Sequence, residues 1–244
     1  MTLACAYARA ETRQLLRIPV YAFSTLAFPV AGLVLFGQQF VDDEPERMLA
    51  GFAATAVLAI AFFQFGVGIA ADRMYRWETY LRTLPAGPGA RLAGRVLSAL
   101  GFSSGAVSAV FVAAVVVYDA RPAPWRAVAL LVVIALGGVP FAFLGLALGY
   151  WLPPRAALPG ANFVFLPLVI GGFLWSRPPD DIPHGVDVAS QLLPTRSWAE
   201  VFDPIATGEG NVPWYHVAAL VAWGTVFFGL AWWGYRRDEG ERFT

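Results

Sequence analysis

Residues 101–105 carry a sequence that matches a hydrolase motif. They read Gly-Phe-Ser-Ser-Gly, which fits G-x-S-x-G with Ser103 as the nucleophile. That motif needs a sharp strand-to-helix turn, whereas these residues lie inside a long hydrophobic stretch. Ser103 could instead serve an intramembrane serine hydrolase with His216 as its base. We expect Ser103 early in an outward-running helix and His216 near the external surface, which would keep the two residues apart.

The small residues at these positions predict helix packing. Gly101 and Gly105 form a G-x-x-x-G pair, which lets a second helix approach closely. Gly145 and Gly149 repeat the same spacing further along the chain. We therefore predict that these four glycines serve packing, and the serine hydrolase remains an alternative.

Other familiar chemistry is missing from the chain. All 17 basic residues are arginine, so the phosphate-binding motif G-x-x-x-x-G-K-[ST] cannot occur, and H-E-x-x-H is also absent. The single cysteine, Cys5, excludes an internal disulfide and a cysteine-based metal framework. We expect no catalytic residue, no cofactor and no metal in this chain. The energy for any active process would have to come from another subunit.

The elements that position these residues follow from six stretches without Asp, Glu, Arg or His. Each stretch is about 20 residues or longer, the length that crosses the hydrocarbon core of a bilayer as a helix. Of all residues, 58% are hydrophobic and only 14% are charged. We predict an all-α polytopic membrane protein, residues 1–244 forming a single transmembrane domain. The six expected transmembrane helices are residues 18–40, 48–71, 95–118, 127–152, 157–176 and 214–235.

The arginines predict the orientation. Twelve of the 17 flank one side of the predicted spans, in the N-terminal tail, the segment between spans two and three, the turn between spans four and five, and the C-terminal tail. The opposite side carries five arginines and most of the acidic residues. Because the cytoplasmic side of a membrane protein holds the excess of arginine and lysine, we expect both termini in the cytoplasm and the spans in the cell membrane.

Three segments outside the spans are long enough to have a role. Residues 3–17 fit an amphipathic interfacial helix with a basic stripe of Arg9, Arg13 and Arg17. Residues 72–94 begin with mixed charged and aromatic residues that suit a helix at the membrane surface, and end in a run rich in Pro and Gly. Residues 177–213 are acidic but contain apolar patches at 186–193 and 198–205, which predict short external helices on or dipping into the membrane face.

These features together resemble the membrane subunit of bacterial type-2 ABC exporters, the family that includes permeases of the daunorubicin and multidrug resistance kind. The likeness extends over essentially the whole chain. Its motifs include Glu11–Pro19 followed by Phe28-Pro29, Asp72-Arg73 through Leu81-Arg82-Thr-Leu-Pro85, Gly94-Arg95, Gly145–Gly149, Asn162, Pro167-Leu168, Gly171-Gly172, and Leu193-Pro194-Thr195 with Trp198.

The resemblance implies a permease without its own ATPase site. Such a subunit dimerises with a second copy or a homologue and binds a soluble ABC-type ATPase on the cytoplasmic face. The segment 72–82 would be the coupling helix between spans two and three, with charged contacts and apolar anchors to the ATPase. The residues expected there are Asp72, Arg73, Arg76, Trp77, Glu78, Tyr80 and Arg82.

The cargo expected for such a permease is hydrophobic or amphipathic, drug-like or lipid-like, because the predicted spans are lined by Phe, Leu, Val and small residues. Two alternatives remain open. One is the serine hydrolase using Ser103, and the other is a membrane anchor that binds an ATPase without transporting anything.

Overall fold

The computed structural model describes residues 3–17, 19–39, 44–74 and 88–241. Every regular element within these ranges is a helix. The all-α polytopic fold predicted from the sequence is therefore confirmed.

The chain begins with α1 (Leu3–Leu16), α2 (Pro19–Phe36) and the short 3-10 turn η1 (Gly37–Gln39). The next helix runs without interruption through α3 (Pro45–Ile60), the π-helical segment η2 (Ala61–Val67) and α4 (Gly68–Asp72). It is followed by α6 (Pro88–Tyr118), α7 (Pro124–Trp151) and α8 (Pro154–Gly171). Two shorter helices, α9 (His184–Gln191) and α10 (Pro194–Thr207), precede α11 (Trp214–Glu241). Proline opens α3, α7, α8 and α10, at positions where its missing N–H group costs nothing and its fixed φ favours the helix.

Five of the described helices are long and apolar enough to cross a membrane. They cover Pro45–Asp72, Ala93–Tyr118, Pro124–Trp151, Pro154–Gly171 and Trp214–Asp238, which correspond to the second to sixth predicted spans. In the region of the first predicted span the described apolar helix is shorter, Ala27–Gln39. The number of six spans therefore stays a prediction.

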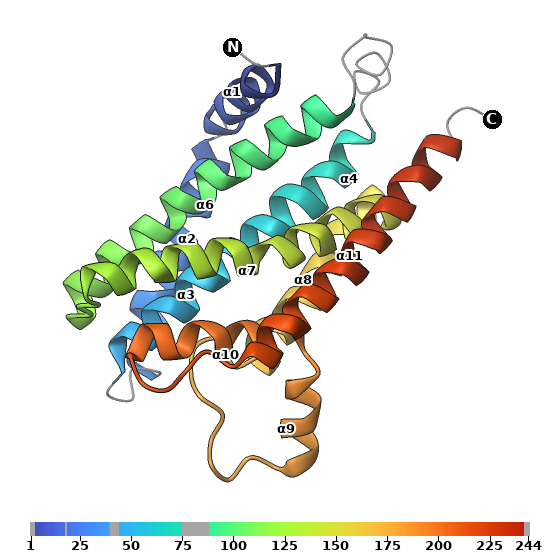
Figure 1. The fold of residues 1–244 in the computed structure, drawn as a ribbon. Coiled ribbons are helices and arrows are strands. Elements are labelled where there is room, and N and C mark those ends of the chain that lie inside the picture. Colours follow the sequence, from blue (N-terminus) through green and yellow to red (C-terminus); the bar gives the residue numbers. More distant parts are fainter. Residues whose placement is uncertain (1–2, 18, 40–43, 75–87, 242–244) are drawn as a thin grey trace.

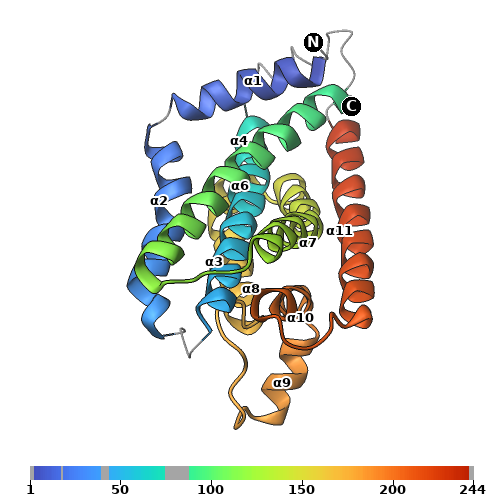
Figure 2. The same ribbon diagram turned by 60° about the vertical axis from the view of Figure 1, so that its left-hand side comes forward.

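The helices form a bundle around the continuous helix α3–η2–α4 (Figures 1 and 2). In this helix 72% of the apolar window is buried, against 22% to 33% in the other four candidate spans. Both ends of the chain lie at the same end of the bundle, here called the termini end, and α9 projects from the opposite end, here called the α9 end (Figure 2). At the termini end α1 lies crosswise over the bundle, against α6.

The predicted packing glycines lie in two different environments. A side-chain carbon at Gly145 would collide with the carbonyl oxygen of Ala61, and one at Gly149 would lie 2.9 Å from the carbonyl oxygen of Gly66. These two glycines therefore allow α7 to approach the backbone of η2. Gly101 and Gly105 are exposed on α6, and a side-chain carbon at Gly101 would meet nothing within 4 Å. Their packing role stays a prediction, and it would need a helix from outside this chain.

The helix α10 packs into the bundle instead of resting on its surface. Trp198 and Phe202 are completely buried, and the ring of Trp198 stacks on Phe141 of α7 at a centroid distance of 5.0 Å. The α9 end of the bundle is therefore filled by the second of the two short helices predicted between the fifth and sixth spans.

Candidate functional site

The predicted ATPase-binding segment begins where the second span ends. Asp72 is the last residue of α4 and Arg73 follows it directly. The remaining residues assigned to this segment, Arg76, Trp77, Glu78, Tyr80 and Arg82, lie outside the described residues. Their contacts with an ATPase therefore stay a prediction, and the geometry described below concerns the helices on either side of them.

Arg73 ties the end of α4 to the ends of two other helices. Its Nε donates to Asp238 Oδ1 of α11 at 2.8 Å, and Asp238 is only 4% exposed. Its Nη1 donates to the carbonyl oxygens of Gly149 and Tyr150 at 3.0 Å and of Leu152 at 3.3 Å. The last carbonyls of a helix have no partner within it and carry partial negative charge, so a guanidinium stabilises the C-terminus of α7. Arg73, which we expected to face the ATPase, thus points its guanidinium into the chain.

Arg95 joins three further elements at the same end. Its Nε donates to Glu11 Oε1 of α1 at 3.0 Å, and its Nη2 is paired with Asp72 Oδ2 of α4. One turn further along α6, Ser98 accepts a hydrogen bond from Thr12 of α1 at 3.0 Å. Burial raises the pKa of the Glu11 carboxyl, and the charge of Arg95 partly offsets this shift. The five residues Glu11, Asp72, Arg73, Arg95 and Asp238 are called the termini-side clamp below.

The basic stripe of the predicted interfacial helix faces away from the bundle. Arg9, Arg13 and Arg17 are exposed, whereas Tyr7 and Glu11 are half-buried on the side that faces α6. The close approach to α6 occurs at Gly94, where a side-chain carbon would lie 3.0 Å from the carbonyl oxygen of Ala4. The arrangement leaves the arginines available to a membrane surface, and that role stays a prediction.

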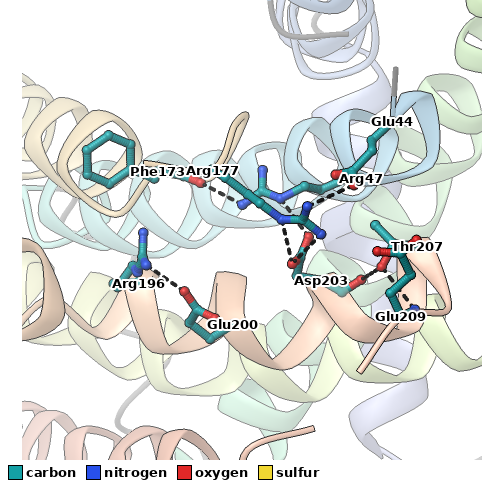
Figure 3. A network of polar contacts seen from close by, with 9 residues as sticks. All are labelled: Glu44, Arg47, Phe173, Arg177, Arg196, Glu200, Asp203, Thr207 and Glu209. Carbon is teal, nitrogen blue, oxygen red and sulfur yellow. Dashed lines mark hydrogen bonds and ion pairs between the residues drawn. The ribbon is translucent and has the colours of Figure 1, made fainter. Parts of the chain in front are cut away.

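A second group of charges lies near the α9 end (Figure 3). Arg47 of α3 pairs with Asp203 of α10 at 2.6 Å and donates to the carbonyl oxygen of Phe173 at 3.4 Å. Arg177 bridges Asp203 at 3.2 Å and Glu44 at 2.8 Å. The remaining pair comes from α10 alone. Its members, Arg196 and Glu200, lie 2.6 Å apart. These residues, called the α9-side cluster, are Glu44, Arg47, Arg177, Arg196, Glu200 and Asp203.

The α9-side cluster and Asp238 were not predicted from the sequence, where these residues are flanking charges of the loops and tails. In the structure Arg47, Arg196 and Asp238 lie on helices and are buried, whereas Glu44 and Arg177 lie outside the helices and are not buried. The sequence offered one signal for these contacts. Arg47 stands directly before a long apolar stretch, and the acidic segment 177–213 is predicted on the same side of the membrane.

The structure gives His216 a partner other than the serine of the hydrolase alternative. His216 Nδ1 and the hydroxyl of Ser197 on α10 are hydrogen-bonded at 3.2 Å, so the described partner of His216 is not Ser103. Ser197 itself is 2% exposed, which leaves a substrate no access to it.

An apolar groove of about 730 Å³ opens between α7, α10 and α11. Its walls include Leu136, Pro140, Phe143, Ile205, Val221 and Phe228. The hydroxyl of Thr225, which also lines it, donates to the carbonyl oxygen of Val221 at 2.9 Å. The groove offers apolar contact and no free charge among its lining residues. In the part of the chain that the structure describes, no three His, Cys, Asp or Glu residues gather where they could hold a metal ion.

Comparison with known protein families gives one match, and a search of curated proteins returns none. The family model of the ABC-2 type transporter matches residues 2–203, which include α1, the first five predicted spans, the termini-side residues of α4 and α6, and most of α10. Because the match extends over most of the 244 residues, this chain belongs to the ABC-2 type transporter family.

Proposed function

We propose that this chain is the permease subunit of an ATP-driven exporter that moves a hydrophobic or amphipathic compound, drug-like or lipid-like, out of a bacterial cell. Membership of the ABC-2 family supports a membrane component that works with an ABC-type ATPase. The apolar groove between α7, α10 and α11 supports an apolar cargo, because charged or sugar-like cargo would find Thr225 as the single polar side chain along those walls.

The ATPase would bind at the termini end, which we assign to the cytoplasm. The assignment rests on the arginine excess in the segments that meet there. The observation that carries the coupling proposal is that both sides of the predicted ATPase-binding segment are anchored in the bundle. At its start, Arg73 ties α4 to α7 and α11. Beyond its end, Arg95 ties α6 to α1 and α4. A force applied to this segment would reach the spans through the helices that these two arginines hold together.

A second copy of the chain, or a homologue, would complete the transporter by packing on α8. The face of α8 away from the bundle exposes Phe163 to 81% and Ile170 to 63%, and it carries the exposed amide of Asn162. Asn162 donates to the carbonyl oxygen of Leu158 at 3.1 Å within its own helix. Amide side chains in membrane helices gain about 0.6 to 2 kcal/mol from hydrogen bonds to a neighbouring helix, which favours a protein partner over lipid on this face.

The proposal is tested by purifying the chain from its native operon context and examining what accompanies it. We expect an ABC-type ATPase to co-purify, and the combined changes Arg76→Glu and Arg82→Glu to release it by charge repulsion. Arg73 is left unchanged, because its reversal would break the contacts with Asp238 and α7 and so confuse binding with folding. Arg155→Glu, on an exposed residue at the start of α8, is the matched control and should retain the ATPase.

Two results would contradict the proposal. If no ATPase accompanies the unaltered chain, the permease assignment is wrong. If the ATPase stays bound to the double variant, the coupling assignment is wrong.

An anchor without transport would bind the ATPase but show no stimulation of ATP hydrolysis by any cargo. The serine hydrolase would lose its activity in Ser103→Ala, a change that a permease should tolerate.

A further inference from the structure

We infer that Arg95 is the positioning residue that makes α1 move together with the end of α4, and that this link transmits the action of the ATPase to the N-terminal helix. The inference rests on the proposed function, since it assigns a route for movement within the permease. It concerns only described residues, namely Arg95 with its partners Glu11 and Asp72.

The geometry of Arg95 suits a link between separate helices. Its Nε contacts Glu11 on α1 and its Nη2 contacts Asp72 on α4, while its own backbone belongs to α6. A guanidinium presents several donors in one rigid plane, so a shift of either acid pulls on the other through the same group. Lysine has a single ammonium on a flexible stem and cannot hold two acids in this fixed relation.

The second arginine of the termini-side clamp explains why the link is needed. Arg73 fixes α4 to α7 and α11 through Asp238 and three backbone carbonyls. The end of α4 is therefore fixed to α7 and α11. The helix α1 packs on α6 through Gly94 and through the Thr12–Ser98 hydrogen bond. Through Arg95, Asp72 at the end of α4 is joined to α1 as well.

The exposure of the link limits what it adds to the stability of the fold. The side chains of Arg95, Glu11 and Asp72 are 24%, 21% and 38% exposed. Ion pairs with this much access to water are individually weak, since solvent competes for both partners. Losing the link should therefore leave the fold intact and let α1 move separately from the end of α4.

The test measures the distance between α1 and the end of α4 in the purified complex of permease and ATPase. One spin label is placed on the native Cys5 of α1 and the other on Ala71→Cys of α4, just before the predicted ATPase-binding segment, and both positions are exposed. We expect this distance to be the same without nucleotide and with a non-hydrolysable ATP analogue in the otherwise unaltered chain. In Arg95→Gln we expect it to shift on addition of the analogue, with the ATPase still bound. Arg155→Gln, an exposed arginine at the same end, is the matched control and should keep the distance constant.

Each other outcome has a definite meaning. A constant distance in Arg95→Gln, or a nucleotide-dependent distance in the unaltered chain, overturns the inference while leaving the proposed function in place. If Arg95→Gln fails to fold, Glu11→Ala removes the other partner of the link and should give the same shift. A constant distance in Glu11→Ala would overturn the inference. If no ATPase binds the unaltered chain, the proposed function fails first, and the inference fails with it.

Discussion

The termini-side clamp and the α9-side cluster are both built on arginines, but they differ in burial. The side chains of Arg47 and Arg196 near the α9 end are 6% and 10% exposed, whereas those of Arg73 and Arg95 are 19% and 24% exposed. The α9-side arginines are also incompletely satisfied. Among the described residues, Nη1 of Arg47 and of Arg196 is buried without a hydrogen-bond partner, and no atom of the termini-side clamp is in that state.

This difference separates contacts whose loss the fold cannot tolerate from contacts whose loss it can. A buried charge is tolerated only while its partner is present, so the α9-side cluster holds α10 in the bundle through a contact that is costly to break. A partly exposed arginine adds less to stability, because water can replace part of the interaction when the partner is lost. We therefore expect substitutions near the α9 end to act on stability, and substitutions near Arg95 to act on coupling.

The largest effect should come from removing the acid that faces Arg47. Asp203→Asn would leave Arg47 buried without a counter-charge, which costs about 3–5 kcal/mol in the free energy of unfolding. For a chain of this size the apparent Tm in detergent should fall by on the order of 10 °C. The control is Asp119→Asn, which removes an exposed partner of Arg121 and should cost about 0–1 kcal/mol. Asparagine also tolerates the positive φ of 55° at position 119. Equal losses in both variants would remove the distinction between the two ends.

An intermediate effect is expected at Arg73, the more buried arginine of the termini-side clamp. Arg73→Gln gives up the ion pair to Asp238 and the charged bonds to the end of α7, but the side chain of Arg73 is 19% exposed, so water can replace part of these interactions. We expect a loss of stability smaller than in Asp203→Asn and larger than in the control Arg236→Gln, measured by the same thermal unfolding. Arg236 is exposed, so its removal should change little. A loss as small as that of the control would mean that α4 is not fixed to α7 and α11 by this residue.

The sequence predicts the spans well because the signal is local. A stretch of about 20 residues without charge must be accommodated in the bilayer or in a core, and each of the last five stretches became a helix long enough to span. The two short helices between the fifth and sixth spans were also visible as apolar patches in an acidic segment. How deeply α10 enters the bundle was not visible, because the burial of Trp198 depends on Phe141 and Gly137 in a different helix.

Ion pairs between residues that are far apart in the chain could not be predicted from the sequence. Arg47 and Asp203 are separated by 156 positions, and Arg73 and Asp238 by 165. Arg73 was grouped with Arg76 and Arg82 because they are neighbours in the chain, yet its direction is decided by the carbonyls at the end of α7. Asp238 follows Arg236 and Arg237 directly and was therefore treated as part of a basic tail.

The smallest effect should come from Glu11, and it also has a pH dependence. Burial raises the pKa of the Glu11 carboxyl, so the folded chain binds a proton there more readily than the unfolded chain does. The stability that Glu11 contributes relative to glutamine is then fully present below the ordinary pKa of a glutamate and is lost as the pH rises through the raised value. At pH 7 Glu11→Gln should cost less than about 1 kcal/mol, because the amide oxygen still accepts the bond from Arg95. Thermal unfolding of both chains at several pH values checks this, with Arg155→Gln as the control. A Glu11→Gln variant that loses more stability at high pH than at low pH would mean that the charge of the pair, and not its hydrogen bond, holds α1 on α6.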